Sequence, residues 1–246
     1  MWNESWYFDF VDAGQQIGGW IRLGLYPNIA TSWVNGLVCG PDMPTYALND
    51  FFEGTGGAID LTLDPTEPLR TYRVTMRGRG EAFDDPAGGL LRGEAGRPPV
   101  KVTMNLEWRT VGTPYLYRIT PRYEIPCTVS GSVTVDGREF SFADVPGQRD
   151  HSWGMRDWWA MDWVWSALHL DDGTRLHGVD IRIPPGGAAV RHRLCADPPR
   201  RVAAGVADRD GTGDVRRQRF TAADDDHVEP GRRRRHVRAQ GQRAGA

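Results

Sequence analysis

The feature that most constrains this fold is a period-two alternation of apolar and polar residues, which recurs through the first 145 residues. Side chains of a β-strand point alternately to its two faces, so this period indicates strands buried on one side. We expect strands at 16–25, 31–39, 58–63, 70–77, 100–110 and 115–124, and a hairpin at 127–142. The hairpin would turn at Asp136-Gly137, a dipeptide that tight hairpins favour.

No segment before residue 145 carries the apolar stripe of a helix, and residues 84–99 have the Gly, Pro and acid content of an exposed loop. Short strands separated by turns are typical of an antiparallel barrel or sandwich. A barrel of about eight strands can enclose one small ligand. The sequence therefore predicts an all-β protein, with an apolar ligand pocket as the natural expectation.

A run rich in tryptophan and charge, Gly147 to Trp165, follows these strands and holds five of the ten tryptophans. Buried charges must be paired or hydrogen-bonded, so the run suits a site better than an ordinary core. His151 is its leading candidate, because an imidazole gives or takes a proton near neutral pH. The alternative is a structural histidine that anchors a strand end by hydrogen bonds.

A second hairpin is predicted from 163–170 and 174–183, with a two-residue turn at Asp172-Gly173. In this register Trp165 lies opposite Asp180, and a shift of one residue would exchange the faces. Asp180 would then be a desolvated carboxyl able to act as a general acid, or else a salt-bridge partner of Arg182 or Arg156. The predicted catalytic pair is His151 and Asp180. The predicted substrate-binding residues are Trp153, Trp165, Trp163, Arg149, Arg156 and His169.

Composition argues against several other classes of protein. The three cysteines are far apart and form no zinc motif, and His169 and His177 lack a third ligand at a suitable spacing, so no metal is expected. No signal peptide or apolar membrane span is apparent, which predicts a cytoplasmic location. Residues 191–246 hold 14 arginines and 8 acids, which leaves 16 basic and 24 acidic residues in the first 190. This acidic part offers no basic face, so no nucleic-acid partner is expected.

From about residue 186 the strand periodicity is lost and Phe220 is the last aromatic residue. We expect a disordered, arginine-rich tail over 186–246 without strands. A basic arm and a solvated linker are both compatible with this composition. We favour a third hypothesis, in which a GC-rich gene is read out of frame after about residue 184.

The run GQRDHSWGMRDWW, with NESWYFDF at Asn3–Phe10 and RYEIPCTVSGSVTVDG at Arg122–Gly137, resembles the carotenoid 1,2-hydratase and AttH-like superfamily, especially its actinobacterial members. DHSWG is its most specific element, and the resemblance extends over residues 2–184. It implies two lipocalin-like β-barrel domains in one chain. The superfamily includes hydroxyneurosporene synthase, which adds water to an isoprenoid double bond, and cyclases of the Diels-Alder type; hydration needs no metal or organic cofactor.

By position, the motif histidine of that family would be His151, the tryptophan two residues on Trp153, and the acid of a following strand Asp180. We expect a lipocalin-like barrel at 1–145, the start of an incomplete second barrel at 146–185, and then the tail. The expected function is a cofactor-free hydratase or cyclase for a hydrophobic isoprenoid or lipid-like substrate. The alternatives are a non-catalytic binding protein for a hydrophobic small molecule and an inactive, truncated family member.

Overall fold

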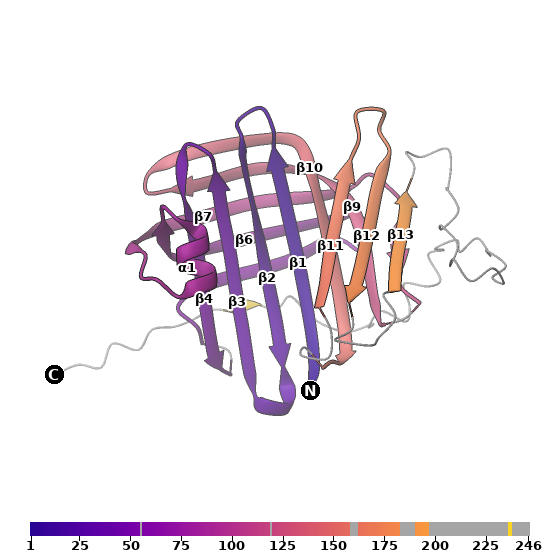
Figure 1. Cartoon of the computed structure of the whole chain (residues 1–246), viewed down its shortest axis with the longest axis horizontal. Coiled ribbons are helices and arrows are strands. Elements are labelled where there is room, and N and C mark those ends of the chain that lie inside the picture. Colours follow the sequence, from indigo (N-terminus) through magenta and orange to yellow (C-terminus); the bar gives the residue numbers. More distant parts are fainter. Residues whose placement is uncertain (55, 119, 158–161, 183–189, 197–235, 238–246) are drawn as a thin grey trace.

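The computed structural model describes residues 1–54, 56–118, 120–157, 162–182, 190–196 and 236–237 (Figure 1). Nearly all of them lie in strands. The strands of the large sheet are β1 (Trp2–Asp12), β2 (Ile17–Tyr26), β3 (Thr31–Gly40), β4 (Met43–Glu53), β5 (Asp60–Glu67), β6 (Thr71–Phe83), β7 (Arg97–Thr110), β8 (Tyr115–Leu116), β9 (Arg122–Val135), β10 (Arg138–Met155) and β14 (His236–Val237). The small sheet holds β11 (Asp162–His169), β12 (Arg175–Arg182) and β13 (Val190–Ala196).

The large sheet closes on itself and forms an all-β, lipocalin-like antiparallel barrel. Its hydrogen-bonded order runs β6, β4, β3, β2, β1, β10, β9 and β7, and β7 pairs again with β6. Closure leaves no free edge within the ring, and β5 adds to β6 outside it. The predicted turn at Asp136-Gly137 connects β9 to β10, and both residues have positive φ, at 50° and 84°.

The barrel interior is filled by alternate side chains of every strand. On β1, Phe8 and Phe10 point inward and are buried in the core, whereas Tyr7 and Asp9 lie on the outer face. Trp108 on β7 is fully buried, and its ring nitrogen donates to the backbone oxygen of Asp9 at 2.7 Å. A packed core therefore fixes the position of β1, and with it the direction of its outward residues.

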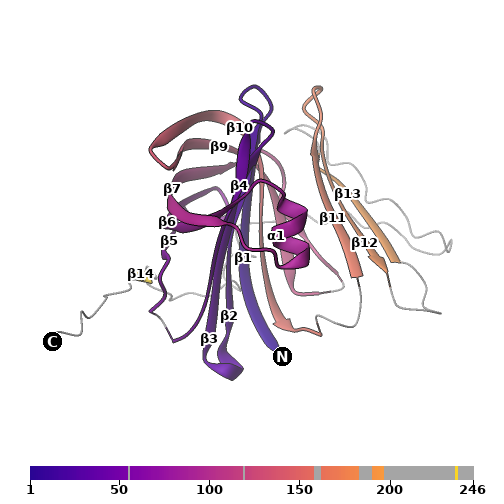
Figure 2. The ribbon, with the colours of Figure 1, turned by 60° about the vertical axis from the view of Figure 1, so that its left-hand side comes forward.

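The small sheet lies beside the barrel, next to β1 and β10, in both views of the chain (Figures 1 and 2). Trp165 of β11 and His177 of β12 face the barrel and pack against Tyr7 and Tyr117. This contact covers part of the barrel's outer surface. Two layers of side chains meet there, and this is the region where polar groups are buried outside the main core.

Several elements differ from the prediction. Strands β1 and β4 were not expected, because aromatic residues stand next to one another in each and blur the alternation. Helix α1 (Pro86–Arg92) lies within the predicted loop; Asp85 caps it and accepts a bond from the backbone N–H of Ala87 at 3.0 Å. Only Gly88 of this helix is buried, so its sequence lacks the apolar stripe from which a helix is predicted.

Strand β10 continues across residue 145 and pairs with β1 as far as Met155, so the ring includes the first part of the predicted second domain. Strands β13 and β14 fall within the segment expected to lack strands. The rest of that predicted tail, with the proposed change of reading frame, lies outside the described residues. Among the described helices, none is long and apolar enough to cross a membrane.

Candidate functional site

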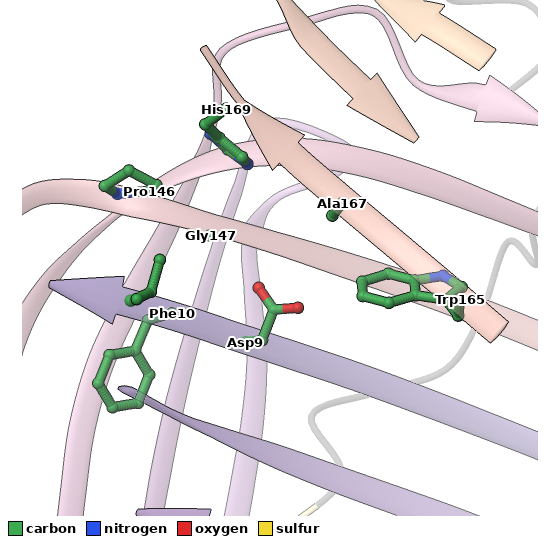
Figure 3. Close-up of a pocket in the computed structure, with 8 residues that line it drawn as sticks. Asp9, Phe10, Pro146, Gly147, Trp165, Ala167 and His169 are labelled. Carbon is green, nitrogen blue, oxygen red and sulfur yellow. The ribbon is translucent and has the colours of Figure 1, made fainter. Parts of the chain in front are cut away.

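A pocket of about 230 Å³ lies between the barrel and the small sheet. Strand β1 and the adjoining part of β10 form one side, and β11 forms the other (Figure 3). The lining is mostly apolar, and Asp9 and His169 carry its ionisable side chains. Burial, together with the charge of Arg175, lowers the pKa of His169 to about 4, so its imidazole is neutral at physiological pH. The lining residues are Asp9, Phe10, Val11, Pro146, Gly147, Trp165, Ala167 and His169.

Asp9 is the acidic group of this pocket. Its carboxylate points toward β11, and the ring of Trp165 extends toward it from that strand (Figure 3). Burial raises the pKa of Asp9 to about 7, although the backbone N–H of Gln148 donates to Oδ1 at 2.6 Å and favours the ionised form. A carboxyl with a pKa near neutrality in an apolar pocket can act as a general acid.

A cluster of buried polar groups lies beside Asp9. The guanidinium of Arg122 donates to Glu124 Oε1 and to Asp150 Oδ2, both at 2.6 Å. Burial raises the pKa of Glu124 and of Asp150, in the second case to about 7, against the opposing charge of Arg122. The side-chain amide of Gln148 donates to Glu124 Oε2 at 3.1 Å, so Gln148 connects the cluster to Asp9.

The hairpin of β11 and β12 completes this cluster. Trp165 Nε1 donates to Glu124 Oε1 at 2.9 Å, and its ring lies 5.5 Å from that of Tyr7 and 5.3 Å from that of His177. His177 Nε2 hydrogen-bonds the hydroxyl of Tyr117. Burial lowers the pKa of His177 to about 3, so it is neutral, and its 3.7 Å approach to Glu124 is not an ion pair at neutral pH. Barrel and hairpin are therefore joined through polar contacts as well as rings.

The structure places His151 inside the barrel, away from this pocket. Its ring stacks on Trp6 at 4.6 Å and lies 4.9 Å from Trp153, and Tyr123 approaches edge-on at 5.5 Å. Nε2 lies 3.1 Å from Glu4 Oε1. His151 and Trp153 lie together in an interior aromatic cluster and line no part of the pocket.

The predicted register of the second hairpin is wrong by one residue. Trp165 pairs with Val179, and Asp180 pairs with Val164, so Asp180 lies on the face opposite to Trp165. The turn has three residues, Asp171 to Gly173, and it ends with Gly173 at a φ of 86°. Three-residue hairpin loops commonly end in such a left-handed residue. His151 and Asp180 are consequently not brought together.

The other predicted binding residues divide among four places. Trp165 and His169 line the pocket. Arg149 is buried inside the barrel, and Arg156 is half-buried at the end of β10. Trp163 shares the face of Trp165 but is 45% exposed.

The residues that sequence reasoning missed are Asp9, Arg122, Glu124, Asp150 and Gln148. A signal for some of them exists in the strands, because Gln148 and Asp150 alternate with Arg149 and His151 and must face the other way. Asp9 occupies the same outward position on β1, where it interrupts an aromatic run. In the described part of the chain, no group of three or more His, Cys, Asp and Glu residues could hold a metal ion.

Solved structures show what this barrel resembles. A crystal structure of a protein provisionally named AttH, from Nitrosomonas europaea, is 15% identical with a TM-score of 0.57, and the match covers 79% of this chain and 65% of that one. The crystal structure of CghA is 11% identical with a TM-score of 0.44, with 82% and 63% covered. The first comparison shows an AttH-like fold. This chain spans slightly less than two thirds of either protein.

No curated protein matches the chain. A family model described as "Domain of unknown function (DUF7064)" matches residues 1–240. That match takes in the barrel, the hairpin and every residue of the pocket between them. The chain therefore belongs to the DUF7064 family.

Proposed function

We propose that this protein binds a hydrophobic, isoprenoid or lipid-like molecule in the pocket between barrel and hairpin, and protonates it from Asp9 as a cofactor-free hydratase or cyclase. The observation that carries the proposal is a partly buried carboxyl, with a pKa raised to about 7, that faces Trp165 in an apolar pocket. Such a group is protonated in part at neutral pH, whereas an exposed aspartate is fully ionised. The AttH-like fold supports the comparison with hydratases.

The chemistry follows from the two groups that face one another. The π electrons of an alkene would take the proton of the Asp9 carboxyl, which leaves a carbocation on the substrate and a carboxylate on the protein. The electron-rich face of Trp165 would stabilise that cation. Water would then add to the cation, and the proton it releases would return to Asp9. In a cyclase, a second double bond of the substrate would take the place of water.

The size of the pocket restricts the part of the substrate that it holds. Ligand sites for drug-sized molecules usually measure roughly 300–1,000 Å³, so a pocket of about 230 Å³ fits one segment of a longer chain. The remaining chain would extend along the apolar surface of Val11 and Pro146. We therefore expect acyclic substrates with a double bond near one end of the chain to fit better than rigid polycyclic substrates.

The test is turnover of short and long acyclic isoprenoid alkenes in deuterated water, with products followed by mass spectrometry. Wild type should form an alcohol or cyclised product with deuterium on carbon, and D9N should lose about a hundredfold or more of the rate. D42N, at an exposed turn aspartate, is the matched control and should behave as wild type. The rate should fall as pH rises above about 7, because only the protonated carboxyl donates. Full activity of D9N would contradict the proposal.

A second candidate function is binding without catalysis, and the apolar lining around Trp165 favours it. In that case D9N should bind the alkene at least as tightly as wild type does, since Asn carries no charge to desolvate. No product should form with either. Binding is measured by the quenching of tryptophan fluorescence, so the two candidates are separated by one pair of proteins.

A further inference from the structure

Arg149 is a buried charge, and two of its three guanidinium nitrogens have no hydrogen-bond acceptor among the described residues. It lies on the inner face of β10, between Phe8 of β1 and Ile125 of β9, and is only 2% exposed. It forms no ion pair with any described residue, and its Nε and one terminal nitrogen reach no acceptor. A guanidinium keeps its charge at any accessible pH. Two donor nitrogens on the inner face of the barrel are therefore available to an anion, which a guanidinium binds strongly.

The groups around Arg149 do not neutralise it. Its central carbon lies 5.4 Å from the ring centre of Tyr72, a cation–π contact that offsets only part of the cost of burying a charge. The neighbouring thiol of Cys127 is a weak acceptor. Burial raises the pKa of Tyr72, so its hydroxyl stays protonated and can donate as well. The carboxylate of Glu4 lies at the same end of the barrel, and its Oε1 is 3.1 Å from His151 Nε2.

The barrel interior approaches solvent at this end. Trp6, Tyr72 and Trp153 are only partly buried where they pack against the core, and the side chain of Glu4 is 18% exposed. Tyr72 contacts Arg149, and Trp6 and Trp153 contact His151, which lies two residues from Arg149 on the same face of β10. A ligand that suits these surroundings has an apolar body and a compact anionic group, which a guanidinium binds through two parallel hydrogen bonds.

We propose that this end of the barrel is a second binding site, which takes the carboxylate of an amphipathic acid on Arg149 and its hydrocarbon part among Trp6, Tyr72 and Trp153. This site lies on the opposite face of β1 and β10 from the pocket at Asp9. The inference goes beyond the proposed function and does not rest on it. A small anion without a hydrocarbon chain would bind the same two donor nitrogens. The experiment must therefore distinguish such an anion from an amphipathic acid.

The test is calorimetric titration of the full chain with decanoate, with decanol as a neutral ligand of equal chain length, and with acetate as a carboxylate without the chain. Wild type should bind decanoate at least about tenfold more tightly than either of the others. R149M keeps a long apolar side chain and should lose this preference, and R149K should retain only part of it. R70M, at an arginine 77% exposed, is the matched control and should bind as wild type does.

Three results would overturn the inference: equal affinity of wild type for decanol and decanoate, equal affinity for acetate and decanoate, or an unchanged decanoate preference in R149M. Because R149M removes a core side chain, its thermal unfolding is measured first. Y72F, which removes one hydroxyl and keeps the ring, is the second variant and should weaken decanoate severalfold without changing decanol. D9N should keep the full decanoate preference. Loss of that preference in D9N would show that the two sites are one.

Discussion

At Asp9 the folded protein holds a carboxyl that is far easier to bury protonated than ionised. Its outward position on β1 would expose it further if the hairpin were absent, because Trp165 and Ala167 of β11 cover part of it. The neighbouring carboxylates of Glu124 and Asp150 add negative potential, while Arg122 is shared between those two. The same arrangement that prepares Asp9 as an acid therefore lowers the stability of the protein at neutral pH.

The D9N variant should reveal this cost as a pH-dependent gain in stability. The pKa of Asp9 is raised from 3.8 to about 7, so between these values the folded state binds more protons than the unfolded state, and wild-type stability falls as pH rises. Each pKa unit corresponds to about 1.4 kcal/mol, so Asp9 accounts for up to roughly 4 kcal/mol above pH 7. Asparagine keeps the acceptor for the Gln148 N–H without a charge.

We therefore expect D9N to be more stable than wild type at about pH 8 and to differ little from it at about pH 4. Urea unfolding at several pH values measures the difference, with D42N as the control for removal of an exposed negative charge. A stability change that is equal at all pH values would mean that Asp9 is not held protonated by burial.

Trp165 helps to hold the hairpin of β11 and β12 against the barrel, together with His177 and Val179, which both contact Tyr117. Trp165 donates to Glu124 and touches the rings of Tyr7 and His177, whereas Trp163, on the same face, is 45% exposed. W165A should therefore loosen the hairpin and destabilise the protein by about 3 kcal/mol or more, because a large ring and a buried acceptor both lose their partners. W163A should cost under about 1 kcal/mol.

Hydrogen exchange measured by mass spectrometry tests this expectation at the level of the element. Peptides of β11 and β12 should exchange faster in W165A, while those of the barrel strands β2 and β3 should not change. Equal protection of the hairpin in W165A and W163A would show that Trp165 holds it no more than Trp163 does. W165A should also weaken ligand binding at the pocket more than W163A does.

The sequence predicted elements with clean alternation and failed at β4, where Phe51 and Phe52 are adjacent, and at β1, where both faces of the strand are covered. Strands β2, β3, β6 and β7 alternate because one face meets the core and the other meets solvent. On β1, Tyr7 follows Trp6 and precedes Phe8, since the hairpin covers the outer face as the core covers the inner one. The pocket lies at just such a doubly covered strand. Alternation therefore could not identify Asp9. The register of the second hairpin was predicted wrongly because its turn has three residues instead of two, so Asp180 lies on the face opposite to Trp165.

At the scale of the whole molecule, the closed ring and the small sheet depend on one another to different degrees. The ring pairs every one of its strands on both sides, and its core contains no residue of the hairpin. The hairpin has its own small cluster, in which Val179 packs with Tyr117 and partly buried Trp165. The barrel should therefore be stable alone, while the pocket and the burial of Asp9 need both parts.

A chain ending at residue 157 separates these contributions. It retains the ring and should show cooperative urea unfolding, because closure and the aromatic core remain intact. Without the hairpin, Asp9 is open to solvent and its pKa should return toward the ordinary value, so the fall in stability between about pH 4 and pH 7 should largely disappear. The isoprenoid pocket should be lost, but decanoate binding at Arg149 should persist, since that site lies within the ring. Failure of this shortened chain to unfold cooperatively would show instead that the hairpin is an integral part of the barrel's stability.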